Sequence, residues 1–341
     1  MSQVVTIGLD IAKSVFQLHG VGAAGAVLLR KRLPRSRMLA FFEKLAPCLI
    51  GIEACGSAHY WGRELSRLGH DVRLIPPSYV KPYVKRQKND AADAEAICEA
   101  VTRPSMRFVP IKAPEQQSMM VAHRTRSILT RQRTQLSNAI RGHMCEFGLV
   151  APVGRNGLEM LIVIINDATD ARVPPTARRS LLMLIAQLRL VNQQILESDR
   201  CIIASARSTE VGKRLMGIPG VGPVLASALV ATIADPKSFS SGRNLAAWIG
   251  LVPRQNSSGG KERLGGITKQ GDRYIRNLLV IGALAVVRYA VRNGARRPWL
   301  VQLLARRTPK VAAVALANKN ARMVWAIMTS GERYREPLVV T

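Results

Sequence analysis

Two acidic residues stand inside two of the most apolar stretches of the first hundred residues. Asp10 lies in "IGLDIAK" and Glu53 lies in "LIGIEACG". Both stretches have the β-branched and apolar composition of strands buried in a sheet. An aspartate is disfavoured in a strand, and a buried carboxylate is costly unless it has a partner. If the two strands are neighbours in one sheet, their acids can meet.

Strand-like and helix-like stretches alternate around these acids. The patterns predict strands at residues 4–13, 14–22, 26–33, 48–56 and 71–77, and helices at 36–46, 58–69 and 90–103. Such alternation implies an α/β domain in which helices cover a sheet. Pro76 and Pro77 should end the last of these strands, just before the basic segment "SYVKPYVKRQK".

A second pair of acids opens the last predicted helix. Asp90 and Asp93 in "KNDAADAEAI" are three residues apart, so they project from one face. Each acid has an ordinary explanation: a turn residue for Asp10, a hydrogen-bonded polar group for Glu53, and an N-cap with a first-turn acid for the other two. Together, four converging carboxylates repel one another unless a cation lies between them. Oxygen ligands favour Mg²⁺ or Mn²⁺, and two such ions about 4 Å apart support phosphoryl transfer.

The chain as a whole is strongly basic. It has 50 lysine and arginine residues against 22 aspartate and glutamate residues, and a formal charge of +28. Such an excess opposes compact folding unless a polyanion neutralises it, and nucleic acid is the leading candidate.

The start "MSQVVTIGLD" has no cationic leader, and the apolar run "NLLVIGALAVV" is too short to span a bilayer. We therefore expect a cytoplasmic protein with no membrane partner. The five cysteines form no CxxC pair, which leaves carboxylates as the expected metal ligands.

Two long helical patterns follow, at residues 114–148 and 177–206, joined by the irregular connection "APVGRNG". They predict an antiparallel coiled-coil arm that binds a partner subunit or a nucleic acid, or alternatively a plain intramolecular bundle. A mainly helical region begins after residue 207. We divide the chain accordingly into a metal-binding catalytic domain at 1–110, a helical arm at 111–207 and a C-terminal domain at 208–341.

The three acidic motifs resemble those of the DEDD transposases of insertion sequence family 110. The stretches "GIPGVGPVLASAL" and "NLAAWIGLVPRQNSSGGKERLGGITKQGDRYIRNLL" resemble the C-terminal transposase domain of the same family. The resemblance covers nearly the whole chain, with the motifs in the same order. It implies a ribonuclease-H-like N-terminal fold, similar to the Holliday-junction resolvase RuvC. It also implies metal-binding roles for Asp10, Glu53, Asp90 and Asp93.

The resemblance further implies an RNA-guided DNA recombinase. In the family a structured non-coding bridge RNA pairs with donor and target DNA, and the protein forms a tetramer built from dimers, with its active site between protomers. Ser258 in "RQNSSGG" falls on the family's nucleophilic serine. A serine that attacks a phosphodiester conserves bond energy in a phosphoserine link, so strands can be rejoined. By itself "NSSGG" is typical of a flexible linker, and Ser257 is an alternative nucleophile.

Several residues are candidates for nucleic-acid contacts. The stretch "GIPGVGPVLASAL" looks like a helix-hairpin-helix element, in which Gly220 and Gly222 would present backbone N–H groups to a phosphate. A tight turn between core helices is the alternative. Arg273 and Arg276 are three apart on a predicted helix and would share a face. The basic candidates are Lys81, Lys85, Arg86, Lys88, Lys261, Arg263, Lys269, Arg273 and Arg276, any of which could instead form a solvated charged face.

Three functions remain open, the first of them implied by the resemblance. The first is an RNA-guided transposase that acts through Ser258. The second is an RNA-independent invertase or a hydrolytic nuclease that uses the same acids with water as nucleophile. The third is a non-catalytic nucleic-acid-binding scaffold, for which the charge alone would suffice.

Overall fold

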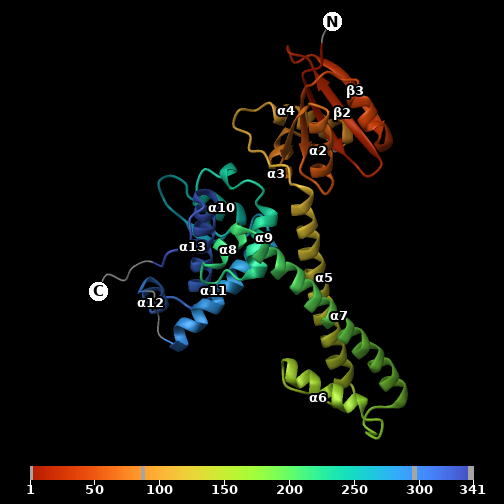
Figure 1. Ribbon diagram of the computed structural model, residues 1–341, viewed down its shortest axis with the longest axis vertical. Coiled ribbons are helices and arrows are strands. Elements are labelled where there is room, and N and C mark those ends of the chain that lie inside the picture. Colours follow the sequence, from red (N-terminus) through yellow and green to blue (C-terminus); the bar gives the residue numbers. More distant parts are fainter. Residues whose placement is uncertain (1–2, 86–88, 294–297, 337–341) are drawn as a thin grey trace. The chain divides into compact units, whose positions relative to one another are not determined.

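The computed structural model describes residues 3–85, 89–293 and 298–336 (Figure 1). The chain forms two compact units, Met1–Pro114 and Glu115–Thr341, and each is described by itself. The first contains a mixed sheet with covering helices, and the second is mainly helical.

The sheet of the first unit has five strands in the order β3-β2-β1-β4-β5. Strands β1, β2 and β3 are antiparallel neighbours, whereas β4 runs parallel to both β1 and β5. The bounds are β1 (Thr6–Ile11), β2 (Val15–Val21), β3 (Val27–Pro34), β4 (Leu49–Glu53) and β5 (Asp71–Ile75). All five predicted strands are confirmed, and β5 ends directly before Pro76.

Helices cover both faces of this sheet. They are η1 (Arg35–Arg37), α1 (Met38–Phe42), α2 (Ala58–Arg67), α3 (Pro77–Val80), η2 (Lys81–Tyr83) and α4 (Asp90–Val101). Leu9 and Ile52 lie in a core with Trp61 and Leu65 of α2, whereas Ile97 and Val101 of α4 pack on the other side with Ile75. Helix α1 is shorter than the predicted 36–46, because the chain turns at residues 43–45 to enter β4.

Two long helices begin the second unit, as predicted. They are α5 (Pro114–Cys145) and α7 (Pro175–Ser208), which run in opposite directions (Figure 1) and are joined by the Arg126–Asp199 ion pair. The prediction of an irregular connection was incomplete, because α6 (Arg155–Asn166) lies within it. Leu161, Ile162 and Ile165 of α6 are buried against α5 and α7, so tertiary contacts stabilise this short helix.

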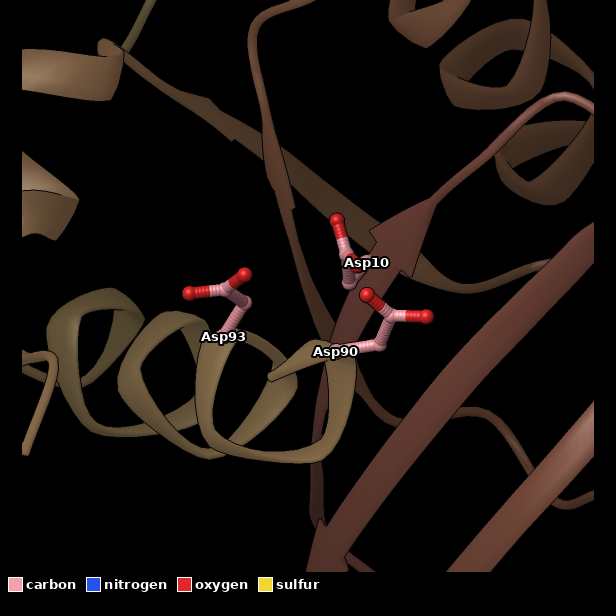
Figure 2. A group of neighbouring side chains, drawn as sticks. All are labelled: Asp10, Asp90 and Asp93. Carbon is pink, nitrogen blue, oxygen red and sulfur yellow. The ribbon is translucent and has the colours of Figure 1, made fainter. Parts of the chain in front are cut away.

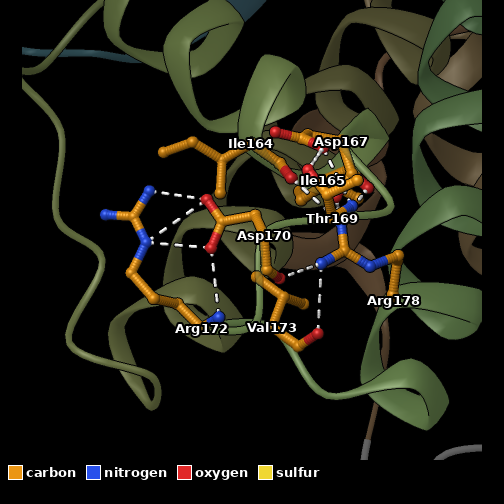
Figure 3. Close-up of polar contacts among 8 residues, drawn as sticks. All are labelled: Ile164, Ile165, Asp167, Thr169, Asp170, Arg172, Val173 and Arg178. Carbon is orange, nitrogen blue, oxygen red and sulfur yellow. Dashed lines mark hydrogen bonds and ion pairs between the residues drawn. The ribbon is translucent and has the colours of Figure 1, made fainter.

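One arginine organises the chain between α6 and α7. The guanidinium of Arg178 donates hydrogen bonds to five backbone carbonyls, those of Ile164, Ile165, Asp167, Asp170 and Val173 (Figure 3). Carbonyls at the end of a helix have no partner within the helix, so the half-buried guanidinium replaces the missing donors. Arg178 thereby closes the end of α6 onto α7.

The rest of the unit is a helical core carrying one small hairpin. Its elements are α8 (Glu210–Met216), α9 (Pro223–Thr232), η3 (Pro236–Ser238), α10 (Gly242–Ile249), β6 (Pro253–Gln255), β7 (Leu264–Ile267), α11 (Arg273–Asn293), α12 (Pro298–Leu304) and α13 (Pro309–Ser330). Within the described residues one stretch, Arg273–Arg292, is long and apolar enough by composition to cross a membrane, which the sequence reading had not allowed for. Its residues Ile275, Leu279 and Ala283 are buried in the protein core, whereas Ile281 and Tyr289 are exposed.

Candidate metal centre and serine hairpin

Asp10 and Glu53 come from the ends of neighbouring parallel strands. The register of β1 and β4 pairs Leu9 with Ile52, and the next residue on each strand is the acid. Parallel strands end at the same edge of a sheet, and residues two apart point to one face. Because Gly8 lies beneath α4, Asp10 projects from the face that α4 covers.

Helix α4 begins at this edge. The side chain of Asn89 accepts a hydrogen bond of 2.8 Å from the Ala92 N–H and so caps the helix. Asp90 and Asp93 occupy the first turn, where the helix dipole favours negative charge. One carboxylate oxygen from each of Asp10, Asp90 and Asp93 lies within 4.8 Å of the others (Figure 2). The fold thus brings together the acids of "IGLDIAK" and "KNDAADAEAI".

Glycine at position 8 allows this approach. A Cβ atom on Gly8 would lie 2.0 Å from the Ala94 carbonyl oxygen and 2.3 Å from the Cys98 nitrogen, both in the backbone of α4. Any side chain at this position would therefore push the helix off the strand. Gly8 was not among the predicted site residues, although a glycine stands two positions before each acid, in "GLD" and "GIE".

The acids act on one another electrostatically. The pKa of the Asp10 carboxyl is raised to about 6, first by burial and then by the negative charges of Asp93, Asp90 and Glu53. Glu53 is half-buried and near enough to contribute, although its oxygens lie outside the 4.8 Å group. A divalent cation would reverse this effect by favouring the charged carboxylates. The three gathered oxygens fit the hard-oxygen donor set of such a cation.

Ser258 lies at the tip of the β6–β7 hairpin. The turn runs Ser258-Gly259-Gly260-Lys261, and the Lys261 N–H donates to the Ser258 carbonyl oxygen over 3.1 Å. Gly259 and Gly260 have φ values of 54° and 75°, which is the left-handed pair that a type I′ turn requires. The stretch "NSSGG" is therefore an ordered turn, which a flexible linker would not form.

The two adjacent serines differ in their hydroxyl groups. The Ser257 hydroxyl accepts a hydrogen bond of 3.2 Å from the Arg263 N–H, which ties it to the opposite side of the hairpin. Ser258 is exposed, and its hydroxyl has no hydrogen-bond partner among the residues that the structure describes. Both serines are exposed, and of the two only Ser258 has a hydroxyl without a partner among the described residues.

Family models match both parts of the chain. A model for DEDD transposases of IS110, described as transposase, matches residues 7–148, which carry all four acids. A model described as transposase IS116/IS110/IS902 family matches residues 212–297, which carry the hairpin. The chain belongs to this transposase family. It is thus an enzyme of DNA strand cleavage and rejoining, and DEDD membership implies the use of a divalent metal.

Curated relatives of the transposase agree over nearly their full length. The chain is 50% identical over 331 residues to "Probable family 20 transposase" of Pseudomonas aeruginosa, covering 96% of this chain and 98% of the relative. It is 39% identical over 332 residues to "Transposase for insertion sequence element IS1328" of Yersinia enterocolitica, covering 97% and 98%. It is also 39% identical over 338 residues to "Transposase for insertion sequence element IS1111A" of Coxiella burnetii, covering 98% and 92%.

The glycines of the transposase's α8–α9 turn have different surroundings. Gly220 has a φ of 89° and packs against α11, where a Cβ on Gly282 would lie 1.9 Å from the Gly220 carbonyl oxygen. Gly220 thus allows the backbones of the turn and of α11 to approach closely, which agrees with the alternative prediction of a tight turn between core helices. Gly222 caps α9 from an exposed position with open space around its Cα. Only Gly222 has room for a ligand near its backbone.

Most basic candidates near the hairpin are exposed, but one is not. Lys261, Arg263, Lys269 and Arg273 are exposed. Arg276 is only 8% exposed, and its guanidinium donates 2.7 Å hydrogen bonds to the Ile249 and Gln270 carbonyls. The predicted shared face of Arg273 and Arg276 was wrong, because the start of α11 packs its second arginine against the end of α10.

The basic segment before α4 is only partly described. Lys81 is exposed, and Lys85 forms a 2.7 Å ion pair with Glu95 of α4. Arg86 and Lys88 lie outside the described residues. Tyr79 is exposed, whereas Tyr83 packs against the core beneath α4.

A buried polar network was also missed. The imidazole of His123 on α5 lies 3.0 Å from the Ser227 hydroxyl and 3.1 Å from the Tyr274 hydroxyl. Burial, followed by the charge of Arg126, lowers the pKa of His123 to about 4. The three residues come from α5, α9 and α11, so no local spacing in the sequence predicts that they meet.

Proposed function

We propose that this transposase cuts and rejoins donor and target DNA through a covalent phosphoserine link at Ser258. Mg²⁺ or Mn²⁺ would be held by Asp10, Glu53, Asp90 and Asp93. The observation that carries the proposal is the gathering of three carboxylate oxygens within 4.8 Å at the joint edge of β1 and α4. The free hydroxyl at the tip of the serine hairpin supports it independently.

A divalent cation in this site supplies Lewis-acid stabilisation of the charge that develops on the phosphate. The chain's own residues supply a fixed set of oxygens. Asp10 is held by the sheet, and Asp90 and Asp93 are held by a capped helix. Neither support depends on a loop, so the donor set is preorganised.

The serine step balances without a cofactor. The Ser258 Oγ forms a bond to phosphorus as the bond from phosphorus to a nucleotide oxygen breaks, the serine proton passes to water, and the released strand end takes up a proton. A hydroxyl of the partner strand then attacks the phosphoserine, which restores the serine and joins the strands. The exchange keeps the number of phosphodiester bonds constant, so no high-energy compound is consumed.

A structured non-coding RNA is the proposed guide. Aromatic residues make up only 5% of the chain, which is few for recognition of many stacked bases, whereas the charge of +28 suits backbone binding. Sequence reading is then delegated to base pairing, as in other guided systems. The exposed residues Lys81, Lys261, Arg263, Lys269 and Arg273, with the Gly222 turn, are proposed phosphate contacts, and Lys85, Arg86 and Lys88 are further candidates.

The assembly is proposed as a cytoplasmic tetramer built from dimers. The paired helices α5 and α7 would be the coiled-coil arm of the expected central domain at 111–207. The α8–α9 pair would act as a helix-hairpin-helix element of the domain at 208–341. Exposed apolar residues on α7, such as Met183 and Leu196, support an arm that packs against another copy.

Covalent trapping tests the chemistry. The full chain is incubated with DNA containing the element ends and the flanking non-coding RNA, then denatured and examined for protein–DNA adducts. Wild type and Ser257→Ala should form an adduct, and Ser258→Ala should form none. Cleavage without any adduct, retained in Ser258→Ala, would instead identify the hydrolytic nuclease.

Sequencing of co-purified RNA tests the guide. The protein is purified from cells that also carry its flanking non-coding DNA, and RNA that survives a high-salt wash is sequenced. One discrete structured RNA supports guidance. Random cellular RNA, or none, would favour the RNA-independent invertase.

A further inference from the structure

A row of side chains crosses the sheet from the acid cluster to the basic edge strand. The register pairs Asp10 of β1 with Gln17 of β2, and Gln17 with Arg32 of β3. Residues directly opposite one another in antiparallel strands point to the same face. Arg32 therefore projects from the face that carries Asp10, two strand spacings or about 10 Å away.

Neighbouring charges confirm which face this is. The next row pairs His19 with Arg30, and the charges of Arg30 and of Glu95 on α4 both influence the pKa of His19. Arg30 thus lies on the α4 side, near Glu95, and so does Arg32 two residues later. On the opposite face Leu18, the register partner of Lys31, is buried in the core with α2.

The charge of Arg30 acts on Glu95 of α4, whereas no acid among the described residues is influenced in this way by Arg32. Arg32 is exposed, and within the described ranges no hydrogen bond or ion pair engages its guanidinium. Gln17, between it and the acids, is half-buried and adds a neutral donor and acceptor. An unpaired guanidinium on an edge strand next to an acidic site suits a phosphate, which it can bind through two hydrogen bonds.

We propose that Arg32 and Gln17 form a track that holds the backbone of the DNA strand delivered to the acid cluster. The inference rests on the proposed metal-dependent cleavage. A span of about 10 Å corresponds to about three nucleotides with a rise of about 3.4 Å each. The acids alone would repel the strand, so a cation flanking the site on the same face offsets that repulsion. Arg32 positions the strand and is not a catalytic residue.

Lys31 provides a matched control. It is the adjacent residue of β3, is also exposed and carries the same charge, but it projects from the opposite face, where its ammonium lies 4.9 Å from the Phe41 ring centroid. Arg32→Gln and Lys31→Gln remove one charge each from the same strand. The two variants differ in the face that loses the charge, and Lys31→Gln also removes the contact with the Phe41 ring.

The experiment measures the affinity of the full chain for a short DNA duplex over a range of salt concentrations, by fluorescence anisotropy. Arg32→Gln should weaken binding about tenfold and lower the salt slope by about one, as expected for the loss of one phosphate contact. Lys31→Gln should stay within about twofold of wild type. Equal losses in the two variants would overturn the track. A loss seen with an RNA duplex of equal length, and not with DNA, would overturn it as well.

Two further measurements separate this inference from the proposed function. Mn²⁺ binding without DNA, measured by calorimetry, should be unchanged in Arg32→Gln; if wild type binds no Mn²⁺, the metal centre fails whatever Arg32 does. DNA with photoreactive groups on its phosphates should cross-link to β3 in wild type. Adducts that avoid β3 while Mn²⁺ binding persists would overturn the track alone.

Discussion

Gly8 of β1 and Gly51 of β4 lie directly opposite one another in the sheet, and helix α4 packs over both. A Cβ on Gly51 would lie 2.8 Å from the Val101 Cβ, and one on Gly8 would meet the α4 backbone even more closely. The pair forms a flat strip on which the helix rests. Two residues further along each strand stand Asp10 and Glu53, so the strip fixes how near α4 brings its own acids.

The first prediction concerns this strip. Gly8→Ala should lower the free energy of unfolding by about 3 kcal/mol, because overpacking forces the helix away from the strand. It should also weaken Mn²⁺ binding at least about tenfold, since a shift of α4 displaces Asp90 and Asp93. Thermal unfolding and calorimetry measure the two effects. Gly56→Ala, where open space surrounds the Cα, is the control and should change neither.

The second prediction concerns pH. The folded-state pKa of Asp10, about 6, lies above the ordinary value of 3.8. Between these two pH values the metal-free folded protein keeps a proton on Asp10 that the unfolded chain has lost. The Asp10 contribution to stability therefore falls as the pH rises from about 4 to about 6. In Asp10→Asn this part of the pH dependence of stability should be absent. A pH series of denaturant unfolding in chelator compares the two, and identical profiles would contradict the shift.

The third prediction concerns metal binding and follows from the same proton. Mn²⁺ must displace it below pH 6, so wild-type affinity should fall about tenfold per pH unit there. Above pH 7 the affinity should level off. Asp10→Asn should bind Mn²⁺ weakly at every pH while keeping its affinity for duplex DNA. Full DNA cleavage by Asp10→Asn would contradict a metal-binding role of Asp10.

The fourth prediction separates the two arginines at the start of α11. Arg276→Ala should lower the free energy of unfolding by about 2–3 kcal/mol, because the carbonyls of Ile249 and Gln270 lose a charged donor. Arg273→Ala should leave stability within about 0.5 kcal/mol and weaken DNA binding. Chemical denaturation and anisotropy measure both variants. Equal destabilisation would show that Arg273 also has a structural role.

The fifth prediction concerns the serine turn. Gly259 has a positive φ, which asparagine tolerates and a β-branched residue does not. Gly259→Asn should keep most of the covalent adduct, whereas Gly259→Val should lose most of it. Both should leave global unfolding nearly unchanged, since the hairpin is exposed. Equal adduct yields would show that the turn geometry does not position Ser258.

Local patterns were sufficient for the strands, the long helices and the helical face that Asp90 and Asp93 share. Alternation in "VFQLHGV" and "LIGIE" defines strands because side chains of a strand alternate between faces. The spacing of Asp90 and Asp93 defines one helical face because a turn has about 3.6 residues. These features depend on neighbours in the chain, and the structure confirmed them.

Tertiary structure decided what depends on residues distant in sequence. The basic composition around Arg276 made it a candidate for a nucleic-acid contact, but packing against the end of α10 buries it. Helix α6 forms because α5 and α7 bury its apolar side. His123 lies within hydrogen-bonding distance of Ser227 and Tyr274 because α5, α9 and α11 meet there. Likewise, the sequence determined which acids could hold a metal, whereas the glycine strip beneath α4 decided how closely they meet. Steric contact between a helix and a sheet depends on atoms that only the folded chain brings together.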